Sequence, residues 1–235
     1  MKTKILGLLA VGLMAGLSVA PEVHATEFRI DLSSLVTTTG GNWNDISDLN
    51  SVTAGLKDFE SGLATGASIS GGGWRDFFGV DAAGDWPDKD WVVSSSVRDG
   101  AGVERGAAGT FSISGLSDTA SYQVEIVSAR TTFNYLNTIL VGGAAANRTF
   151  NGTTVNTPWG STADGLASQN WLIWDGQKAA GGVLNISLAA APDTLGMMNA
   201  MRIVEMPSGV PEPGTLALLG LGLAGLGLSR RRKAN

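Results

Sequence analysis

The fold class is decided by residues 109–127, Gly-Thr-Phe-Ser-Ile-Ser-Gly-Leu-Ser-Asp-Thr-Ala-Ser-Tyr-Gln-Val-Glu-Ile-Val. Apolar and polar side chains alternate in each half, with Phe and Ile in the first half and Tyr, Val and Ile in the second. Alternation is typical of a strand with one buried face, because successive side chains of a strand point to opposite sides. Ser117-Asp118 supplies turn chemistry between the halves. The stretch therefore predicts two half-buried β-strands.

Further short segments of the same kind lie on both sides of this stretch. They are Phe28–Leu32, Leu136–Val141, Trp171–Trp174, Val183–Leu188 and Met197–Val204. Turn dipeptides such as Asn-Gly, Asp-Gly and Gly-Gly stand between them. Asn44–Leu63 instead spaces apolar residues by three and four, as a helix does, but its poor helix formers fit a broken helix or a long loop equally well. Short strands with polar turns favour an all-β fold, an antiparallel β-sandwich, over βαβ units.

The join between the two central strands carries a resemblance. Gly-Leu at 115–116, a short turn and Tyr-Gln-Val at 122–124 are similar to a join found in the galactose-binding-like superfamily of jelly-roll domains. The last two predicted strands also resemble that superfamily's closing pair. The resemblance covers about residues 105–205, whereas residues 42–103 do not align with it. It implies a jelly-roll-like sandwich and identifies no catalytic residue.

The N-terminal segment has the pattern of a secretory signal peptide. Two lysines precede an apolar run at residues 5–20, and Val23-His24-Ala25 places small residues where signal peptidase requires them. We therefore expect residues 1–25 to form a signal helix that is cleaved between Ala25 and Thr26. The alternative is an uncleaved anchor, which the shortness of the apolar run disfavours.

The C-terminal segment has three parts in a fixed order. A Pro-Glu-Pro element in residues 208–214 cannot continue a helix, since each proline lacks a backbone donor and restrains its predecessor. An apolar run of about fifteen residues follows at 215–229, a marginal length for a membrane span. A basic cluster at 230–235 is the kind of group that stays on the cytoplasmic side. The elements of the signal are Val210, Pro211, Glu212, Pro213, Arg230, Arg231 and Arg232.

This tail resembles the PEP-CTERM sorting signal of Gram-negative bacteria. The resemblance implies a partner, an exosortase-type membrane protease-transpeptidase that reads and cuts the tail. It also implies a single exported domain at residues 26–207, held transiently in the inner membrane and then delivered to the cell surface or extracellular matrix. Proteins of this class are associated with exopolysaccharide, biofilm or floc formation.

Composition excludes several functions for the exported part. Residues 26–208 contain ten basic and nineteen acidic residues, a net charge of −9, against −5 for the whole chain. An acidic surface disfavours nucleic acid and anionic lipid as partners. The chain has no cysteine, and its one histidine, His24, belongs to the signal peptide. Schemes that need Cys or His nucleophiles, bases or metal ligands are therefore unavailable after export.

One acidic stretch and several tryptophans are candidate binding residues. The stretch could wrap Ca²⁺ with oxygen ligands, or it is simply a solvated acidic loop; its carboxylates are Asp81, Asp85, Asp88 and Asp90. The same carboxylates could form a glycosidase acid/base pair, although nothing in the sequence assigns the two roles. The tryptophans that lie in polar, turn-rich segments are Trp43, Trp74, Trp86 and Trp159. Such rings either stack on sugars or plug the ends of the sandwich.

Two more tryptophans, Trp171 and Trp174, lie in a predicted strand. We expect both in the core, on opposite sides of the strand, because they are three residues apart. Taken together, the sequence predicts an exported, non-catalytic β-sandwich that binds glycan or builds matrix. The alternatives are a carboxylate-dependent glycan-processing enzyme and a purely structural envelope protein.

Overall fold

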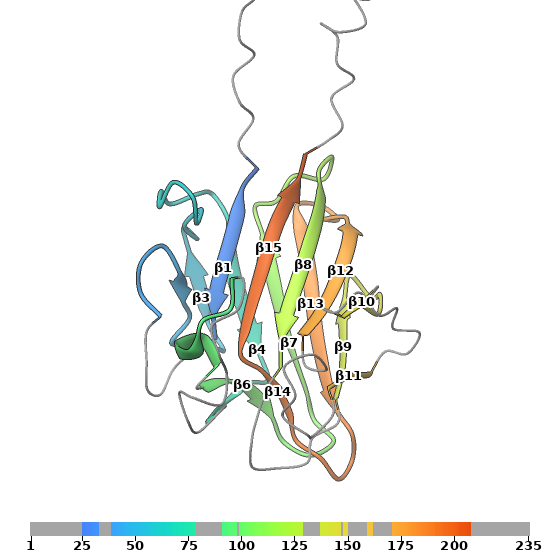
Figure 1. Cartoon of the computed structure of the whole chain (residues 1–235). Coiled ribbons are helices and arrows are strands. Elements are labelled where there is room, and N and C mark those ends of the chain that lie inside the picture. Colours follow the sequence, from blue (N-terminus) through green and yellow to red (C-terminus); the bar gives the residue numbers. More distant parts are fainter. Residues whose placement is uncertain are drawn as a thin grey trace, which may run out of the picture.

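The computed structural model of the chain shows an antiparallel β-sandwich, which confirms the predicted all-β class (Figure 1). The described residues are 25–32, 39–78, 91–97, 99–128, 137–146, 148–149, 159–161 and 171–207. The predicted signal and membrane helices lie outside these ranges. In the described part, no helix is long and apolar enough to cross a membrane.

Two six-stranded sheets face each other. The first has the order β10-β12-β8-β15-β1-β2, and the second has the order β11-β9-β13-β7-β4-β3. The first sheet contains β1 (Glu27–Asp31), β2 (Asn44–Asp45), β8 (Ser121–Val127), β10 (Arg148–Thr149), β12 (Trp171–Gln177) and β15 (Ala200–Met206). The second contains β3 (Val52–Ala54), β4 (Ser68–Gly72), β7 (Ala108–Ser114), β9 (Asn137–Val141), β11 (Trp159–Ser161) and β13 (Val183–Ala190). All pairs are antiparallel except β1 with β2.

A smaller sheet and one helical turn complete the described part. The sheet has the order β14-β6-β5 and contains β5 (Arg75–Phe78), β6 (Asp99–Val103) and β14 (Gly196–Met198). The turn is the 3₁₀ helix η1 (Ser94–Val97). Both lie beside the end of the sandwich where β1 finishes (Figure 1).

The predicted central strands are correct, but they belong to different sheets. Strand β7 lies in the second sheet and β8 in the first, so the turn between them carries the chain across the sandwich. Gly115, at φ +81°, starts this crossing in a conformation that L side chains rarely adopt. The hydroxyl of Tyr122 accepts a hydrogen bond of 2.8 Å from the backbone N–H of Ser117 and fixes the far side of the turn.

Alternation along the strands separates two apolar clusters. The inward residues of both sheets form the main core, which includes Ile30, Val124 and Trp174. A smaller cluster lies on the outer face of the first sheet and is built around Trp91 and Trp171. The prediction that Trp171 and Trp174 point to opposite sides of their strand is therefore confirmed.

Two expectations about secondary structure need correction. The helical interpretation of residues 44–63 is wrong: the segment is an irregular loop with β2 and β3. Ile46, Leu49 and Leu56 are buried, whereas Val52 and Leu63 are 67% and 70% exposed, so the apolar residues do not share one face.

The predicted strand at 197–204 is also interrupted. It is divided at Asn199 into β14 and β15, because the chain passes there from the small sheet to the first sheet. The Asn199 amide fixes this passage by donating to the carbonyl of Asp99 at 2.9 Å.

Candidate functional site

Trp74 belongs to the core and has no free ring face. It is 4% exposed and stacks on Phe111, with ring centroids 4.4 Å apart. Its indole N–H donates to the carbonyl of Thr110 at 2.7 Å. Gly109 makes room for the ring, since a Cβ there would lie 2.7 Å from it. The structure thus places Trp74 with the tryptophans that seal the sandwich.

Trp43 lies at the surface cluster of the first sheet. It is 7% exposed and its ring lies 5.9 Å from that of Trp91. Unlike Trp74, it contributes to the lining of an open pocket. Of the predicted tryptophans whose side chains are described, Trp43 is the one at a candidate site.

The other predicted site residues are described only in part or not at all. Trp86, the four aspartates Asp81, Asp85, Asp88 and Asp90, and the sorting residues from Val210 to Arg232 lie outside the described residues. Trp159 is described through its backbone in β11. Ala25 and Thr26 are half-buried, and β1 begins directly after them. Cleavage between them, and Ca²⁺ binding by the acidic stretch, stay predictions.

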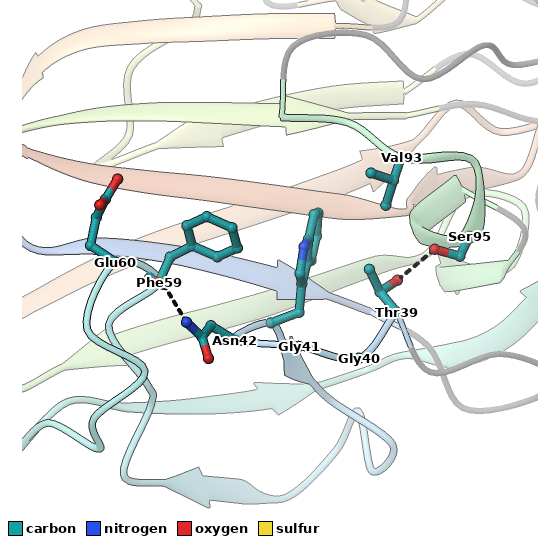
Figure 2. Close-up of a pocket in the computed structure, with 9 residues that line it drawn as sticks. Thr39, Gly40, Gly41, Asn42, Phe59, Glu60, Val93 and Ser95 are labelled. Carbon is teal, nitrogen blue, oxygen red and sulfur yellow. Dashed lines mark hydrogen bonds between the residues drawn. The ribbon is translucent and has the colours of Figure 1, made fainter.

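The pocket that contains Trp43 lies beside β1, and we call it the Phe59 pocket (Figure 2). Its volume is about 550 Å³. It is lined by Thr39, Gly40, Gly41, Asn42, Trp43, Phe59, Glu60, Val93 and Ser95. The pocket thus combines two aromatic rings with hydroxyl, amide and carboxylate groups. Two loops, 39–43 and 59–60, and the segment that contains η1 bring these residues together.

Phe59 is held against the first sheet through both its backbone and its ring. Its backbone N–H donates to the carbonyl of Glu27 at 2.7 Å, and its own carbonyl accepts from the Asn42 amide at 2.8 Å. The guanidinium of Arg29 lies 3.5 Å from the centre of its ring, a cation–π contact. The position of the ring is therefore set by three partners.

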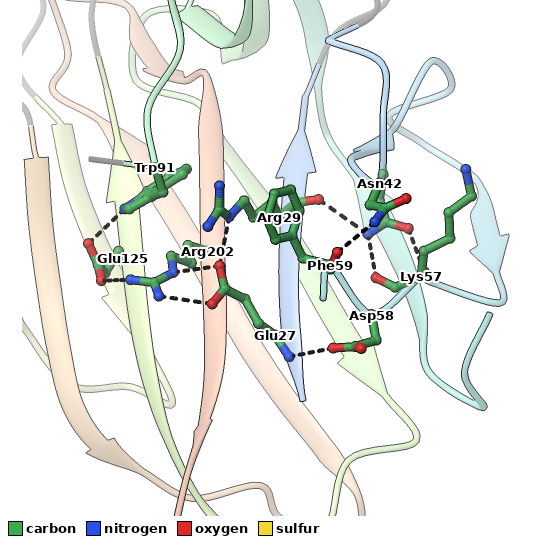
Figure 3. Close-up of polar contacts among 10 residues, drawn as sticks. Glu27, Arg29, Asn42, Lys57, Asp58, Phe59, Trp91, Glu125 and Arg202 are labelled. Carbon is green, nitrogen blue, oxygen red and sulfur yellow. Dashed lines mark hydrogen bonds and ion pairs between the residues drawn. The ribbon is translucent and has the colours of Figure 1, made fainter. Parts of the chain in front are cut away.

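Charged residues cross the outer face of the first sheet beneath this pocket (Figure 3). The carboxylate of Glu27 accepts from Arg29 at 2.6 Å and twice from Arg202, at 2.9 Å each. Arg202 also donates to Glu125 at 3.0 Å. Burial raises the pKa of Glu27, but the hydrogen bonds and charges of the two arginines outweigh it and hold the pKa below its usual value. Glu27 is thus ionised at neutral pH.

Glu125 connects this charge network to the tryptophan cluster. One of its oxygens accepts from the indole N–H of Trp91 at 2.8 Å and from that of Trp171 at 2.9 Å. The rings of these two tryptophans meet edge to face, with centroids 5.6 Å apart. These hydrogen bonds attach Trp91 to the outer face of the first sheet. Val93, two residues further along the chain, lines the pocket.

At another side of the pocket, the lining residue Thr39 is hydrogen-bonded to a buried carboxyl group. The hydroxyl of Thr39 donates to Asp31, and its backbone N–H donates to Asp45 at 3.1 Å. Ser95 donates to the Thr39 hydroxyl at 3.2 Å. Asp31 is fully buried, and burial, with the charges of Asp99 and Asp45 added, raises its pKa to about 8 although the Thr39 hydrogen bond opposes the shift.

These features limit the chemistry of the site. Among the lining residues of the Phe59 pocket, Glu60 is the one carboxylate. Within the described ranges, no group of three acidic or histidine side chains has a spacing that could hold a metal ion. What the pocket does offer is an aromatic surface with directional polar groups around it.

Most of the residues that build this site carry no functional signal in the sequence. Glu27, Glu125 and Arg202 occupy outward positions in alternating strands, where a charged residue is usually solvated. The alternation predicts that these side chains point outward. It does not predict that β15 pairs with β1 and β8, which brings the three side chains together. Phe59 lies in the segment 44–63, whose spacing of apolar residues resembles that of a helix and does not indicate a binding site.

Comparison with known proteins identifies the tail. Residues 209–233 match the PEP-CTERM protein-sorting motif, as the sequence pattern predicted. The motif implies an exported protein that is anchored transiently in a membrane and processed by an exosortase, a membrane enzyme. No curated protein matches the chain.

Two solved structures have a distant similarity to part of this chain. An exo-β-1,3-galactanase from Phanerochaete chrysosporium, solved with galactose, is 13% identical, with a TM-score of 0.31 over 62% of this chain and 31% of its own. A family GH115 4-O-methyl-α-glucuronidase with specificity for decorated arabinogalactans is 14% identical, with a TM-score of 0.28 over 56% of this chain and 17% of its own. The chain thus spans less than a third of either enzyme.

Proposed function

We propose that the protein is a cell-surface or matrix component whose β-sandwich binds a glycan, without catalysis, in the Phe59 pocket. The sorting motif supports export. The observation that carries the binding proposal is the Phe59 ring, which lines an open pocket and is held in place by Arg29. Ligand sites typically combine such apolar surface with a few fixed polar groups.

The pocket is suited to a sugar for two physical reasons. An aromatic ring offers a flat apolar face, which matches the C–H face of a pyranose. Polar groups also line the pocket. The Thr39 hydroxyl keeps one acceptor lone pair beyond its bonds to Asp31 and Ser95, and the Asn42 side chain keeps one N–H and its oxygen beyond its bond to Phe59. These groups and the Glu60 carboxylate can bind sugar hydroxyls. The volume of about 550 Å³ lies in the ordinary range of small-molecule sites, about 300–1,000 Å³.

Binding fits the pocket better than glycoside hydrolysis. Both common hydrolytic mechanisms need two carboxyl groups, about 5–9.5 Å apart. Glu60 has no second carboxylate beside it among the residues that line the pocket. Two carboxyl groups next to the pocket, those of the buried Asp31 and the partly buried Asp45, instead accept hydrogen bonds from Thr39.

The test is a binding panel with the exported, processed protein. Soluble polysaccharides, including the exopolymer of the producing cells, are titrated with tryptophan fluorescence and calorimetry as readouts, with and without Ca²⁺. We expect saturable binding that falls about five- to tenfold in Phe59→Leu, since stacking on an aromatic face contributes roughly 1–1.4 kcal/mol. Glu60→Gln should lower the affinity less, because the amide keeps one acceptor.

The control is Val52→Ala, which removes an exposed apolar side chain in β3, away from the pocket. If the protein binds no glycan of the panel, the purely structural alternative remains. Release of reducing sugar during the titration would favour the enzyme. Binding that survives Phe59→Leu unchanged would place the ligand elsewhere on the domain.

A further inference from the structure

Both ends of the domain leave the sandwich at the same place. Glu27, the first residue of β1, pairs with Val204 of β15. One residue further out, the backbone N–H of Glu205 donates to the carbonyl of Thr26 at 2.8 Å. Strand β1 therefore begins where β15 ends, at the upper end of the sandwich in Figure 1.

The sorting motif follows this end at very short range. Strand β15 ends at Met206, and Pro211 of the Pro-Glu-Pro element is five residues further along the chain. Five residues span at most about 18 Å, whatever their conformation. An enzyme bound to Pro211-Glu212-Pro213 therefore has the end of the folded domain within that distance.

The tether cannot lengthen while the domain stays folded. Strand β15 is internal to the first sheet and pairs with β1 on one side and β8 on the other. Its inward residues Met201 and Ile203 are fully buried, and its outward Arg202 bonds Glu27 and Glu125. Peeling β15 away would break the core and this network together.

The same end carries exposed apolar side chains. In the described part of the chain, the large hydrophobic residues that are exposed are Val52, Leu63 and Met206. Met206 ends β15. Leu63 lies in the turn whose Asp58 accepts from the N–H of Glu27 and donates its own N–H to the carbonyl of Leu63.

A cavity of about 180 Å³ also opens at this end of the sandwich, lined by residues close to Leu63 and Met206 in the chain, Thr65 and Glu205 among them. Its apolar part is formed by Phe28, Ala67, Leu116 and Tyr122, and Thr26 and Glu205 lie where the chain enters and leaves the sandwich. We call this region, with Leu63 and Met206, the terminal face. Single exposed apolar residues are common on protein surfaces. These two lie at the end of the domain that carries the sorting motif, within reach of any enzyme bound to that motif.

We propose that the terminal face is a docking surface for the exosortase-type enzyme that processes the tail, so that processing takes place with the folded domain seated on the enzyme. Because the tether between the domain and the sorting motif is short, weak contacts between the terminal face and the enzyme are sufficient for docking. A second contact made within one short linker experiences an effective concentration in the millimolar range. Leu63 and Met206 then supply the apolar contacts, and the sorting motif supplies the specificity.

The experiment follows processing of the full-length precursor in cells that express the exosortase. Conversion to the shorter form is measured in a pulse-chase on gels. Leu63→Glu should slow conversion about fivefold, the effect of losing roughly 1 kcal/mol at an interface. Val52→Glu is the matched control, since Val52 is 67% and Leu63 70% exposed, and it should be converted at the wild-type rate.

A second change tests the role of the short tether. About ten Gly/Ser residues inserted between Ser208 and Gly209 should also slow conversion, because a longer linker lowers the effective concentration. In that longer chain, Leu63→Glu should have little further effect. Equal melting temperatures of the processed wild type and Leu63→Glu establish that the domain stays folded.

Several results would overturn the proposal. Conversion of Leu63→Glu at the wild-type rate would show that the face makes no contact. Equal slowing by Val52→Glu would show a general effect of added charge. Faster conversion of the chain with the insertion would show that the domain obstructs the enzyme. Leu63-dependent flotation of the exported protein with phosphatidylethanolamine/phosphatidylglycerol vesicles, without the enzyme, would assign the face to lipid instead.

Discussion

Arg202 makes two hydrogen bonds of 2.9 Å to the carboxylate of Glu27, although the two residues are 175 positions apart in the chain. They stand on adjacent strands, β15 and β1, at the outer face of the first sheet. Their side chains are only 20% and 8% exposed. The pair thus joins the two ends of the domain in a partly desolvated, charge-assisted contact.

Arg202→Met should strongly destabilise the protein. The change leaves Glu27 and Glu125 largely buried with one cation fewer between them, and breaking a buried ion pair from one side costs about 3–5 kcal/mol. Chemical denaturation of the exported protein measures the loss. Arg75→Met, at the exposed pair with Glu104, should change the free energy of unfolding by less than about 1 kcal/mol. Equal effects of the two substitutions would contradict the structural role assigned to Arg202.

Trp74→Ala should lower the free energy of unfolding by about 3–5 kcal/mol, as is typical of large-to-small changes in a core. The ring stacks on Phe111 and its N–H bonds Thr110, so both packing and a hydrogen bond are lost. Denaturation again provides the measurement. Glycan affinity, measured where the variant is fully folded, should be unchanged. A loss of affinity without a loss of stability would place Trp74 at the ligand.

Gly71→Ala should destabilise the sandwich by about 1–3 kcal/mol, the usual cost of overpacking. A Cβ at this position would overlap the carbonyl oxygen of Leu49 and lie 2.7 Å from the ring of Phe111. Gly72→Ala is the matched control, because a Cβ at the next position meets nothing within 4 Å. Thermal unfolding of the two variants should therefore separate them, and equal melting temperatures would contradict the close approach of the Leu49 loop to β4.

Asp31 should make the protein less stable as the pH rises from about 4 to about 8. Its pKa is raised from 3.8 to about 8 in the folded protein, so the folded state binds the proton across this interval and the unfolded state does not. The free energy of unfolding then falls by up to about 1.4 kcal/mol per pH unit and levels off above pH 8.

Asp31→Asn tests this pH dependence. The amide keeps an acceptor for the Thr39 hydroxyl but cannot ionise, so stability should vary less with pH between 4 and 8 than in the wild type. Asp193→Asn, at an exposed position, should follow the wild-type profile. Parallel profiles for Asp31→Asn and the wild type would show that Asp31 does not titrate in this range.

The six strands predicted in the second half all correspond to strands of the structure, the last one divided into β14 and β15, because alternation is a local property of each strand. The first half was harder. Residues 42–78 pack through isolated residues such as Ile46, Leu49 and Leu56, which reach the core from an irregular chain. Their spacing imitates a helix, and only the loop geometry around Gly55, at φ +68°, shows otherwise.

For the tryptophans too, the sequence predicted the positions within a regular strand but not those in loops. Position within a strand predicted the two faces of Trp171 and Trp174. Turn-rich surroundings did not distinguish Trp74, which is sealed in the core, from Trp43, which lines a pocket. Whether a ring in a loop is exposed depends on which strands the loop covers, and Trp74 lies over Gly109, 35 residues further along the chain.

The sequence by itself determined the fold class and the sorting signal, since both are written in local order: the period of side chains in short strands and the succession of three segments in the tail. The tertiary structure alone decided the Phe59 pocket, the network of Glu27, Arg202 and Glu125, and the internal place in its sheet of β15, the strand that precedes the sorting motif in the chain. Each of these depends on contacts between residues tens to nearly two hundred positions apart. Strand order sets such contacts, and alternation within one strand carries no information about which strand lies next to it.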